Sequence, residues 1–225
     1  TETKQGVMDG DLRVFRQKDV WVRGQTVVVA VAPTVDELLA WLEENGEVID
    51  DLISEDRYAR MKKAMYSQYE QDDLADSLRN AHGWSIRIPH DYNFTGSKTD
   101  PAYARLRRHY PDRFVTVAWK SGDAETMSAD MLVEWRDEIG LTYPDSSRCN
   151  PIVLDTMWTT LGGVDALKAH GLWETFSPLG GGPFVAYLLH KDGTLYLVDG
   201  KVFAPDRAKE PTVRHLEVVL NTFQP

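Results

Sequence analysis

The chain has 225 residues, which is enough for one domain with a sizeable hydrophobic core. Its formal net charge of −10 disfavours a surface for nucleic acid or anionic membrane, because both of these partners are negatively charged. The longest purely apolar run, residues 27–32, is far shorter than the roughly 20 residues of a membrane-spanning helix, so no transmembrane segment is expected. The single cysteine, Cys149, excludes an internal disulfide framework.

The first third of the chain predicts a strand followed by helices. Residues 20–31 are rich in valine and predict a strand. Thr34 and Glu37 have the spacing of a capping box, in which each residue satisfies a free backbone donor at a helix start. The helix that they open is expected to end near residue 45. A second helical stretch is expected over residues 54–83, with a glycine at its end.

The middle of the chain predicts strands around one amphipathic helix. Residues 84–88, 113–119 and 151–160 predict strands. Residues 102–110 fit either a strand or a helix, since their Ala-Arg-Leu-Arg-Arg composition favours a helix. Ser128 is placed to cap the amphipathic helix. The apolar side of that helix consists of Met131, Leu132, Trp135 and Ile139.

The C-terminal third predicts a β-hairpin and a closing helix. Residues 184–189 are apolar on both faces, as in a central strand. The Asp-Gly pair at 192–193 is the strongest short-range hairpin signal, because both turn positions need positive φ. A second Asp-Gly pair, at 199–200, indicates a bulge or another tight turn. Residues 211–223 begin with proline and carry one apolar stripe, which predicts a helix.

This order of elements predicts an α+β fold. Direct hairpin pairing implies an antiparallel sheet, and the amphipathic helices are expected to pack mainly on one face of it. We expect residues 1–12 to be a flexible N-terminal segment and residues 13–225 to form a single α+β domain.

Two motifs invite a ligand-binding interpretation that their context does not support. The glycines at residues 180–182 precede a strand, whereas a phosphate-binding loop follows a strand and opens a helix. We therefore expect a structural turn there. The histidines lack metal-ligand spacing, and His90, Asp91 and His109 would form a site only if the fold brought them together. We expect no metal and no cofactor.

Four residues are the candidates for ligand binding: Trp158, Trp173, Glu174 and Asp199. The two tryptophans flank the glycine-rich section, and aromatic faces bind the apolar faces of sugars or peptides. Glu174 and Asp199 would have to face each other across a cleft to act as the carboxylate pair of a glycosidase. The sequence contains no complete catalytic constellation, so no catalytic residue is assigned.

The run GLWETFSPLGGGPFVAYLLHKDGTLYLVDGKVFAP, residues 171–205, resembles the closing signature of a Bacteroidetes envelope-lipoprotein family described as domain of unknown function 4837. Residues 20–33, 82–94 and 131–140 are similar to further passages of that family. The likeness therefore covers roughly residues 13–223.

The resemblance has three implications. It favours a strand at residues 102–110. It implies a location in the cell envelope, periplasmic or associated with the outer membrane. Family members carry a lipoprotein signal and a further N-terminal segment, whereas this sequence begins at Thr1, so a lipid anchor is expected only on a longer precursor.

Two functions from different classes remain. The first is a non-enzymatic cell-envelope protein that binds a ligand or a protein or glycan partner, which the resemblance and the missing catalytic constellation favour. The alternative is a hydrolase with an acidic site, directed at carbohydrate. A concave pocket with converging carboxylates or histidines would favour the hydrolase. No nucleic-acid partner is expected.

Overall fold

The computed structural model describes residues 13–144 and 146–225. The segment expected to be flexible, residues 1–12, lies outside the described residues. The chain divides into two compact units, Thr1–Met65 and Tyr66–Pro225, and each has its own internal structure. The single domain expected over residues 13–225 stays a prediction.

The first unit contains a two-stranded antiparallel sheet and most of a long helix. Strand β1 (Arg13–Lys18) pairs with β2 (Thr26–Val31), and helix α2 (Val35–Tyr66) follows. The strand predicted over residues 20–31 is correct only in its second half. Gly24 has a φ of 83°, which belongs to a turn, so the valine-rich segment begins to pair only after it.

Helix α2 begins with the predicted capping box and continues past its predicted end. The Glu37 N–H donates to Thr34 Oγ1 (3.2 Å), and the Thr34 hydroxyl donates to Glu37 Oε1 (3.0 Å). Asn45 departs from helical geometry with φ −126°, which is not the left-handed conformation that ends helices, so the helix kinks and resumes. The helical stretch predicted over residues 54–83 is therefore two helices: its first part continues α2 to Tyr66, and its second part is a separate helix, α3 (Asp72–His82).

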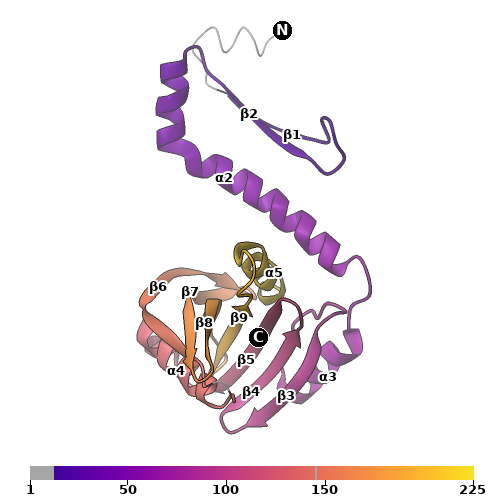
Figure 1. Ribbon diagram of the computed structural model, residues 1–225, viewed down its shortest axis with the longest axis vertical. Helices are drawn as coiled ribbons and strands as arrows, with labels where there is room; N and C mark the ends of the chain where they lie inside the picture. Colours follow the sequence, from indigo (N-terminus) through magenta and orange to yellow (C-terminus); the bar gives the residue numbers. More distant parts are fainter. Residues whose placement is uncertain (1–12, 145) are drawn as a thin grey trace. The chain divides into compact units, whose positions relative to one another are not determined.

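The second unit is built on a seven-stranded antiparallel sheet with the strand order β3-β4-β5-β9-β8-β7-β6 (Figure 1). Sheet and helices together confirm the α+β class. The strands are β3 (Asn93–Thr99), β4 (Ala102–Arg108), β5 (Asp112–Ser121), β6 (Arg148–Leu161), β7 (Val164–Phe176), β8 (Leu179–Lys191) and β9 (Thr194–Phe203).

The helices of this unit lie on both faces of the sheet. They are α3 (Asp72–His82), the 3₁₀ helix η1 (Ala124–Thr126), α4 (Ala129–Leu141) and α5 (Glu210–Leu220). Trp135 of α4 shares a buried cluster with Ala186 and Leu197, and we call this side of the sheet the α4 face. Leu216 of α5 lies against Gly200 on the opposite side, the α5 face.

Helix α3 ends on the α5 face as well. The His82 ring lies 4.5 Å from the ring of Trp119, and Trp119 pairs with Tyr196, whose ring contacts Phe223 just beyond α5. Gly83 ends α3 in the left-handed conformation, as predicted. Two of the three α-helices of this unit thus share one face, in agreement with helices packed mainly on one side.

The central hairpin has the predicted structure. Strands β8 and β9 pair antiparallel, and the turn between them has φ of 48° at Asp192 and 78° at Gly193. Residues 185–189 are at most 2% exposed, so this part of β8 is buried on both faces. Helix α5 packs against both strands.

Some elements of the second unit differ from the sequence-based predictions. Residues 84–88 form no strand, because Ser85 alone pairs, in an isolated antiparallel bridge with Gln224, although the apolar side chains alternate and are buried. Residues 102–110 contain strand β4, the outcome that the resemblance favoured. The pair Asp199-Gly200 forms neither a bulge nor a turn, since β9 pairs on both sides without a register shift. Gly200 instead makes room for α5, with its ideal Cβ position 3.0 Å from Leu220 Cδ1.

The glycines at residues 180–182 lie inside strand β8, so the predicted turn is wrong. None of them has positive φ, and they pair with residues 173–175 of β7. Gly182 is needed for space: the indole N–H of Trp173 donates to the Val202 carbonyl (3.0 Å), and a Cβ on Gly182 would lie 3.3 Å from the indole nitrogen. A glycine can serve close packing as well as positive φ.

We expect Gly182→Ala to lower the free energy of unfolding by about 2–4 kcal/mol. The new Cβ would lie 2.1 Å from the Val202 carbonyl oxygen, a backbone atom of a central strand. Guanidinium denaturation measures the change. The control is Gly180→Ala, whose Cβ meets Thr175 Oγ1 at 3.2 Å and should cost less than about 1 kcal/mol. Equal losses in the two variants would contradict this explanation.

Candidate functional site

A pocket of about 510 Å³ lies at the end of the β7–β8 hairpin, and we call it the β7–β8 pocket. Its lining consists of Asn150, Leu172, Trp173, Glu174, Thr175, Phe176, Leu179, Gly180, Gly181, Gly182, Pro183 and Lys209. The three glycines contribute backbone and no side chain to this wall. The segment expected to be a turn without a ligand-binding role therefore forms part of a hollow.

Glu174 supplies the carboxylate of the pocket, and Asn150 orients it. The Asn150 Nδ2 donates to Glu174 Oε2 (2.9 Å), and the Asn150 Oδ1 accepts from the Ile152 N–H (2.9 Å). The pairing of β6 with β7 is interrupted between Cys149 and Leu154, so these hydrogen bonds lie in a bulge of β6. Asn150 thus stabilises the bulge with one end of its amide and holds Glu174 with the other.

The rim of the pocket is apolar and exposed. Leu179 is 87% exposed and Phe176 is 64% exposed, at the two ends of the hairpin turn. Leu172 adds a third partly exposed apolar side chain, and Lys209 adds one ammonium group. Exposed apolar side chains around a concavity are typical of binding sites. The arrangement suits a ligand with an apolar body and a hydrogen-bond donor that reaches Glu174.

The structure brings two of the four candidate residues together and separates the other two. Glu174 and its β7 neighbour Trp173 line the pocket, but the Trp173 indole is 4% exposed and packs on the α4 face, so it offers no open aromatic surface to a ligand. Trp158 is 59% exposed on β6, which is an edge strand. Asp199 is buried beneath α4.

Glu174 and Asp199 cannot act as a catalytic pair. Trp173 belongs to the cluster on the α4 face, so the next residue of β7, Glu174, points to the opposite face. Asp199 binds Arg136 of α4 and therefore lies on the α4 face. The sheet itself stands between the two carboxylates.

Sequence reasoning missed Asn150, Phe176, Leu179 and Lys209. The Asn-Pro pair at 150–151 was a signal for an interrupted strand, and the Ser-Pro pair at 177–178 was a signal for the turn that presents Phe176 and Leu179. Lys209 had no such signal, because its place at the pocket depends on the path of the chain between β9 and α5.

Asp199 belongs to a buried polar group beneath α4. The Arg136 Nε donates to Asp199 Oδ1 (2.8 Å), with side-chain exposures of 4% and 9%. The Lys201 Nζ donates to Ser147 Oγ (3.0 Å) beside a cavity of about 10 Å³, which is room for about one water molecule. Burial raises the pKa of Cys149 to about 11, although Arg136 lies beside its thiol. These groups have no access to a substrate and stabilise the packing of α4 on the sheet.

We expect Asp199→Ala to lower the free energy of unfolding by about 3–5 kcal/mol, because Arg136 would remain buried without its carboxylate. The double variant Arg136→Met with Asp199→Leu should recover part of that loss, since no unpaired charge is left. Glu174→Ala is the control and should cost about 1 kcal/mol or less, because the Glu174 carboxylate accepts from the neutral amide of Asn150. Urea denaturation measures all three variants. An Asp199→Ala variant with an unchanged free energy of unfolding would contradict the structural role of Asp199.

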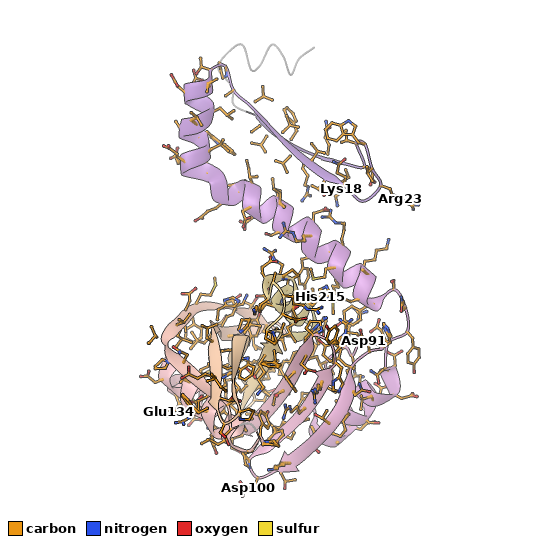
Figure 2. All side chains as sticks on the ribbon, viewed as in Figure 1. Lys18, Arg23, Asp91, Asp100, Glu134 and His215 are labelled. Atoms are coloured by element: carbon orange, nitrogen blue, oxygen red, sulfur yellow. The ribbon has the colours of Figure 1, made fainter. Side chains whose placement is uncertain are left out.

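A third polar group lies on the α5 face around His215 (Figure 2). The Arg113 Nη1 donates to His215 Nδ1 (2.8 Å), and a guanidinium can only donate, so this nitrogen carries no proton. Arg108 forms an ion pair with Asp91 nearby (2.5 Å). Burial and the guanidinium groups of Arg113 and Arg108 lower the pKa of His215 to about 4.

The low pKa of His215 predicts a loss of stability in mild acid. The unfolded chain binds a proton at this residue below its ordinary pKa of 6.5, whereas the folded chain does so only below about 4. Stability is therefore complete above pH 6.5 and falls by up to about 3 kcal/mol as the pH drops to 4. His215→Gln keeps an acceptor for Arg113 and should remove this component. If the unfolding free energies of the wild type and of His215→Gln fall equally between pH 7 and 4, the role of His215 is contradicted.

The structure does not assemble His90, Asp91 and His109 into a metal site. Asp91 is paired with Arg108, and His109 Nδ1 lies 3.2 Å from Asp112. Over residues 13–144 and 146–225, no three His, Cys, Asp or Glu side chains are grouped closely enough to hold a metal ion. In the same part of the chain, no helix has both the length and the apolar character needed to cross a membrane.

Three solved structures have a similar arrangement of the chain. CyanoP, the PsbP protein of Synechocystis sp. PCC 6803, is 12% identical, with 63% of this chain and 86% of that chain covered and a TM-score of 0.46. LpqN of Mycobacterium tuberculosis, described as involved in cell envelope biogenesis, is 14% identical over 63% and 83% of the two chains, with a TM-score of 0.39. A protein of Bacteroides thetaiotaomicron VPI-5482 is 12% identical over 63% and 44%, with a TM-score of 0.38.

No curated protein matches the sequence. The family described as "Domain of unknown function (DUF4837)" matches residues 71–222, more than half of the chain. The match lies within the second unit and contains the seven-stranded sheet and every lining residue of the β7–β8 pocket. The protein therefore belongs to the family of domain of unknown function DUF4837, the family that residues 171–205 resemble.

Proposed function

We propose that this protein is a non-enzymatic binding protein of the cell envelope and that it holds its ligand in the β7–β8 pocket. One observation carries the proposal. A pocket of about 510 Å³, an exposed apolar rim and an oriented carboxylate occur at one place on the second unit.

The size and chemistry of the pocket support binding. Its volume lies within the roughly 300–1,000 Å³ of pockets that bind small molecules. An apolar group of a ligand would displace water from Leu172, Phe176 and Leu179. A donor on the same ligand would reach Glu174, whose second oxygen is not used by Asn150. An apolar lining with a few oriented polar groups gives affinity and orientation together.

The same lining does not support hydrolysis. Glu174 is the one carboxylate among the lining residues, all of which are described, and no histidine, serine or cysteine accompanies it. A glycosidase needs two carboxylates across the scissile bond, and Asp199 lies on the other face of the sheet. No observation favours the hydrolase.

The envelope location is part of the proposal. It is supported by the likeness of residues 171–205 to the closing signature of envelope lipoproteins and by membership of that family. The ligand would then be a component of the envelope, such as a protein segment or a glycan with an apolar face.

Photo-crosslinking in cells that make the full-length protein tests the site. Benzoylphenylalanine at Leu179, on the rim, should form an adduct of defined mass. The same group at Leu141, which is 57% exposed at the end of α4, should form none. In the Leu179 variant, Glu174→Gln should reduce the adduct by about tenfold or more, because it removes the charge that accepts the ligand's donor.

Two results would contradict the proposal. Equal adducts at Leu179 and Leu141 would mean that crosslinking reports exposure alone. Recovery of the full-length protein in the cytosolic fraction would contradict the envelope location and leave the pocket to be tested by the Glu174 variant.

A further inference from the structure

The two edges of the seven-stranded sheet differ in length, charge and shape. Each edge strand pairs on one side only, so the backbone N–H and C=O groups of its outer side are not used within the sheet. Such an edge accepts a further strand unless a charge, a bulge or a short length prevents it. Strands β3 and β6 are protected to very different degrees.

Strand β3 is protected in each of these ways. It has 7 residues and carries Lys98. A register shift between Phe94 and Gly96, where Gly96 has a φ of 135°, breaks the strand near its middle. Lysines and bulges are the usual means by which proteins keep an edge unpaired.

Strand β6 has 14 residues and lacks this protection beyond its bulge. Residues 151–158 are all exposed, and Asp155 is the one charged residue among them. From Leu154 to Leu161 the strand pairs with β7 without a register shift, so its outer side is regular. The large apolar side chains exposed on it are Ile152, Val153, Leu154, Met157 and Trp158.

We propose that β6 pairs antiparallel with β6 of a second copy of this chain, with the two-fold axis at Thr156. The proposal does not depend on the β7–β8 pocket. Two seven-stranded sheets would join into one continuous sheet, an isologous contact in which each copy offers the same strand.

The free backbone N–H and C=O groups of the β6 edge determine which kind of partner can bind there. Only another polypeptide strand presents alternating donors and acceptors that match a strand edge, at a spacing of about 4.8 Å. Charge opposes a second copy least at this edge. The chain carries a net charge of −10, which opposes self-association over most of its surface, but residues 151–158 carry a single charge.

The pairing at Thr156 is complementary residue by residue. Leu154, Thr156 and Trp158 share one side of β6, because their β7 partners Gly171, Ala169 and Leu167 alternate in register. A two-fold axis at Thr156 puts each Trp158 opposite Leu154 of the second copy. It puts the two threonines opposite each other, and aromatic–aliphatic and Thr–Thr pairs across strands are favourable.

The same axis removes the one repulsive contact. Asp155 of each copy lies opposite Met157 of the other and not opposite its own counterpart. Five paired residues per copy, 154–158, form a small interface, so the expected dissociation constant is in the micromolar range.

Sedimentation velocity of the whole chain, from about 1 to 200 µM, tests the proposal. The wild type should shift from monomer to dimer over this range. Thr156→Lys puts two ammonium groups opposite each other and should raise the dissociation constant at least tenfold. The control Ser97→Lys adds the same charge to an exposed position of β3 and should leave the dissociation constant unchanged. Thermal melts confirm that both variants fold.

A mixing experiment tests the self-pairing of Thr156 directly. Thr156→Glu alone should be monomeric, as Thr156→Lys is, whereas an equimolar mixture of the two should form a heterodimer. A wild type that stays monomeric at 200 µM would overturn the proposal and leave β6 to a different partner. A dimer that persists in Thr156→Lys, or a mixture that stays monomeric, would overturn it as well.

Discussion

The indole of Trp173 reaches across Gly182 and donates its N–H to the Val202 carbonyl, so a side chain of β7 is bound to the backbone of β9 over the intervening β8. This hydrogen bond requires that residue 182 of β8, which lies between the indole and the carbonyl, has no side chain. Gly182 pairs with Trp173 and faces the indole on the α4 face, whereas Gly181 pairs with Glu174 and faces the β7–β8 pocket on the opposite side. Neighbouring glycines of β8 therefore serve the packing of the core on one face of the sheet and the pocket on the other.

Burial of β8 and β9 on both faces decides what the polar residues can do. Side chains of successive residues go to opposite faces, so groups that are close in sequence, or on neighbouring strands, are separated by the sheet. Asp199 and Lys201 point beneath α4 and find Arg136 and Ser147 there. Such groups must be hydrogen-bonded because a buried charge without a partner is costly. Glu174, on the other face, is left partly accessible, with the Asn150 amide to orient it.

The sequence predicted those parts of the fold whose signal is local. The capping box at Thr34, the Asp-Gly turn and the two-faced apolar run of β8 depend on near neighbours, and each is confirmed. Glycine is ambiguous, because a sequence does not tell whether it is needed for positive φ or for space, and residues 180–182 were misread for that reason. Ligand binding by the four candidate residues stays a prediction. The place of Trp173 and Glu174 beside the glycines could be read from the sequence, whereas the burial of Asp199 could not, because its partner Arg136 is 63 residues away.

Cys149 shows what the packing of α4 means for work with the protein. Its thiol is buried, is bound by Arg136 and has a pKa of about 11, and it is the only thiol of the chain. An alkylating reagent can reach it only when α4 and the start of β6 separate, since a thiol reacts as the exposed thiolate. The rate of alkylation therefore reports how often this part of the fold opens, with no engineering of the protein. For the same reason, a cysteine introduced on the surface can carry a label while the natural one remains in place.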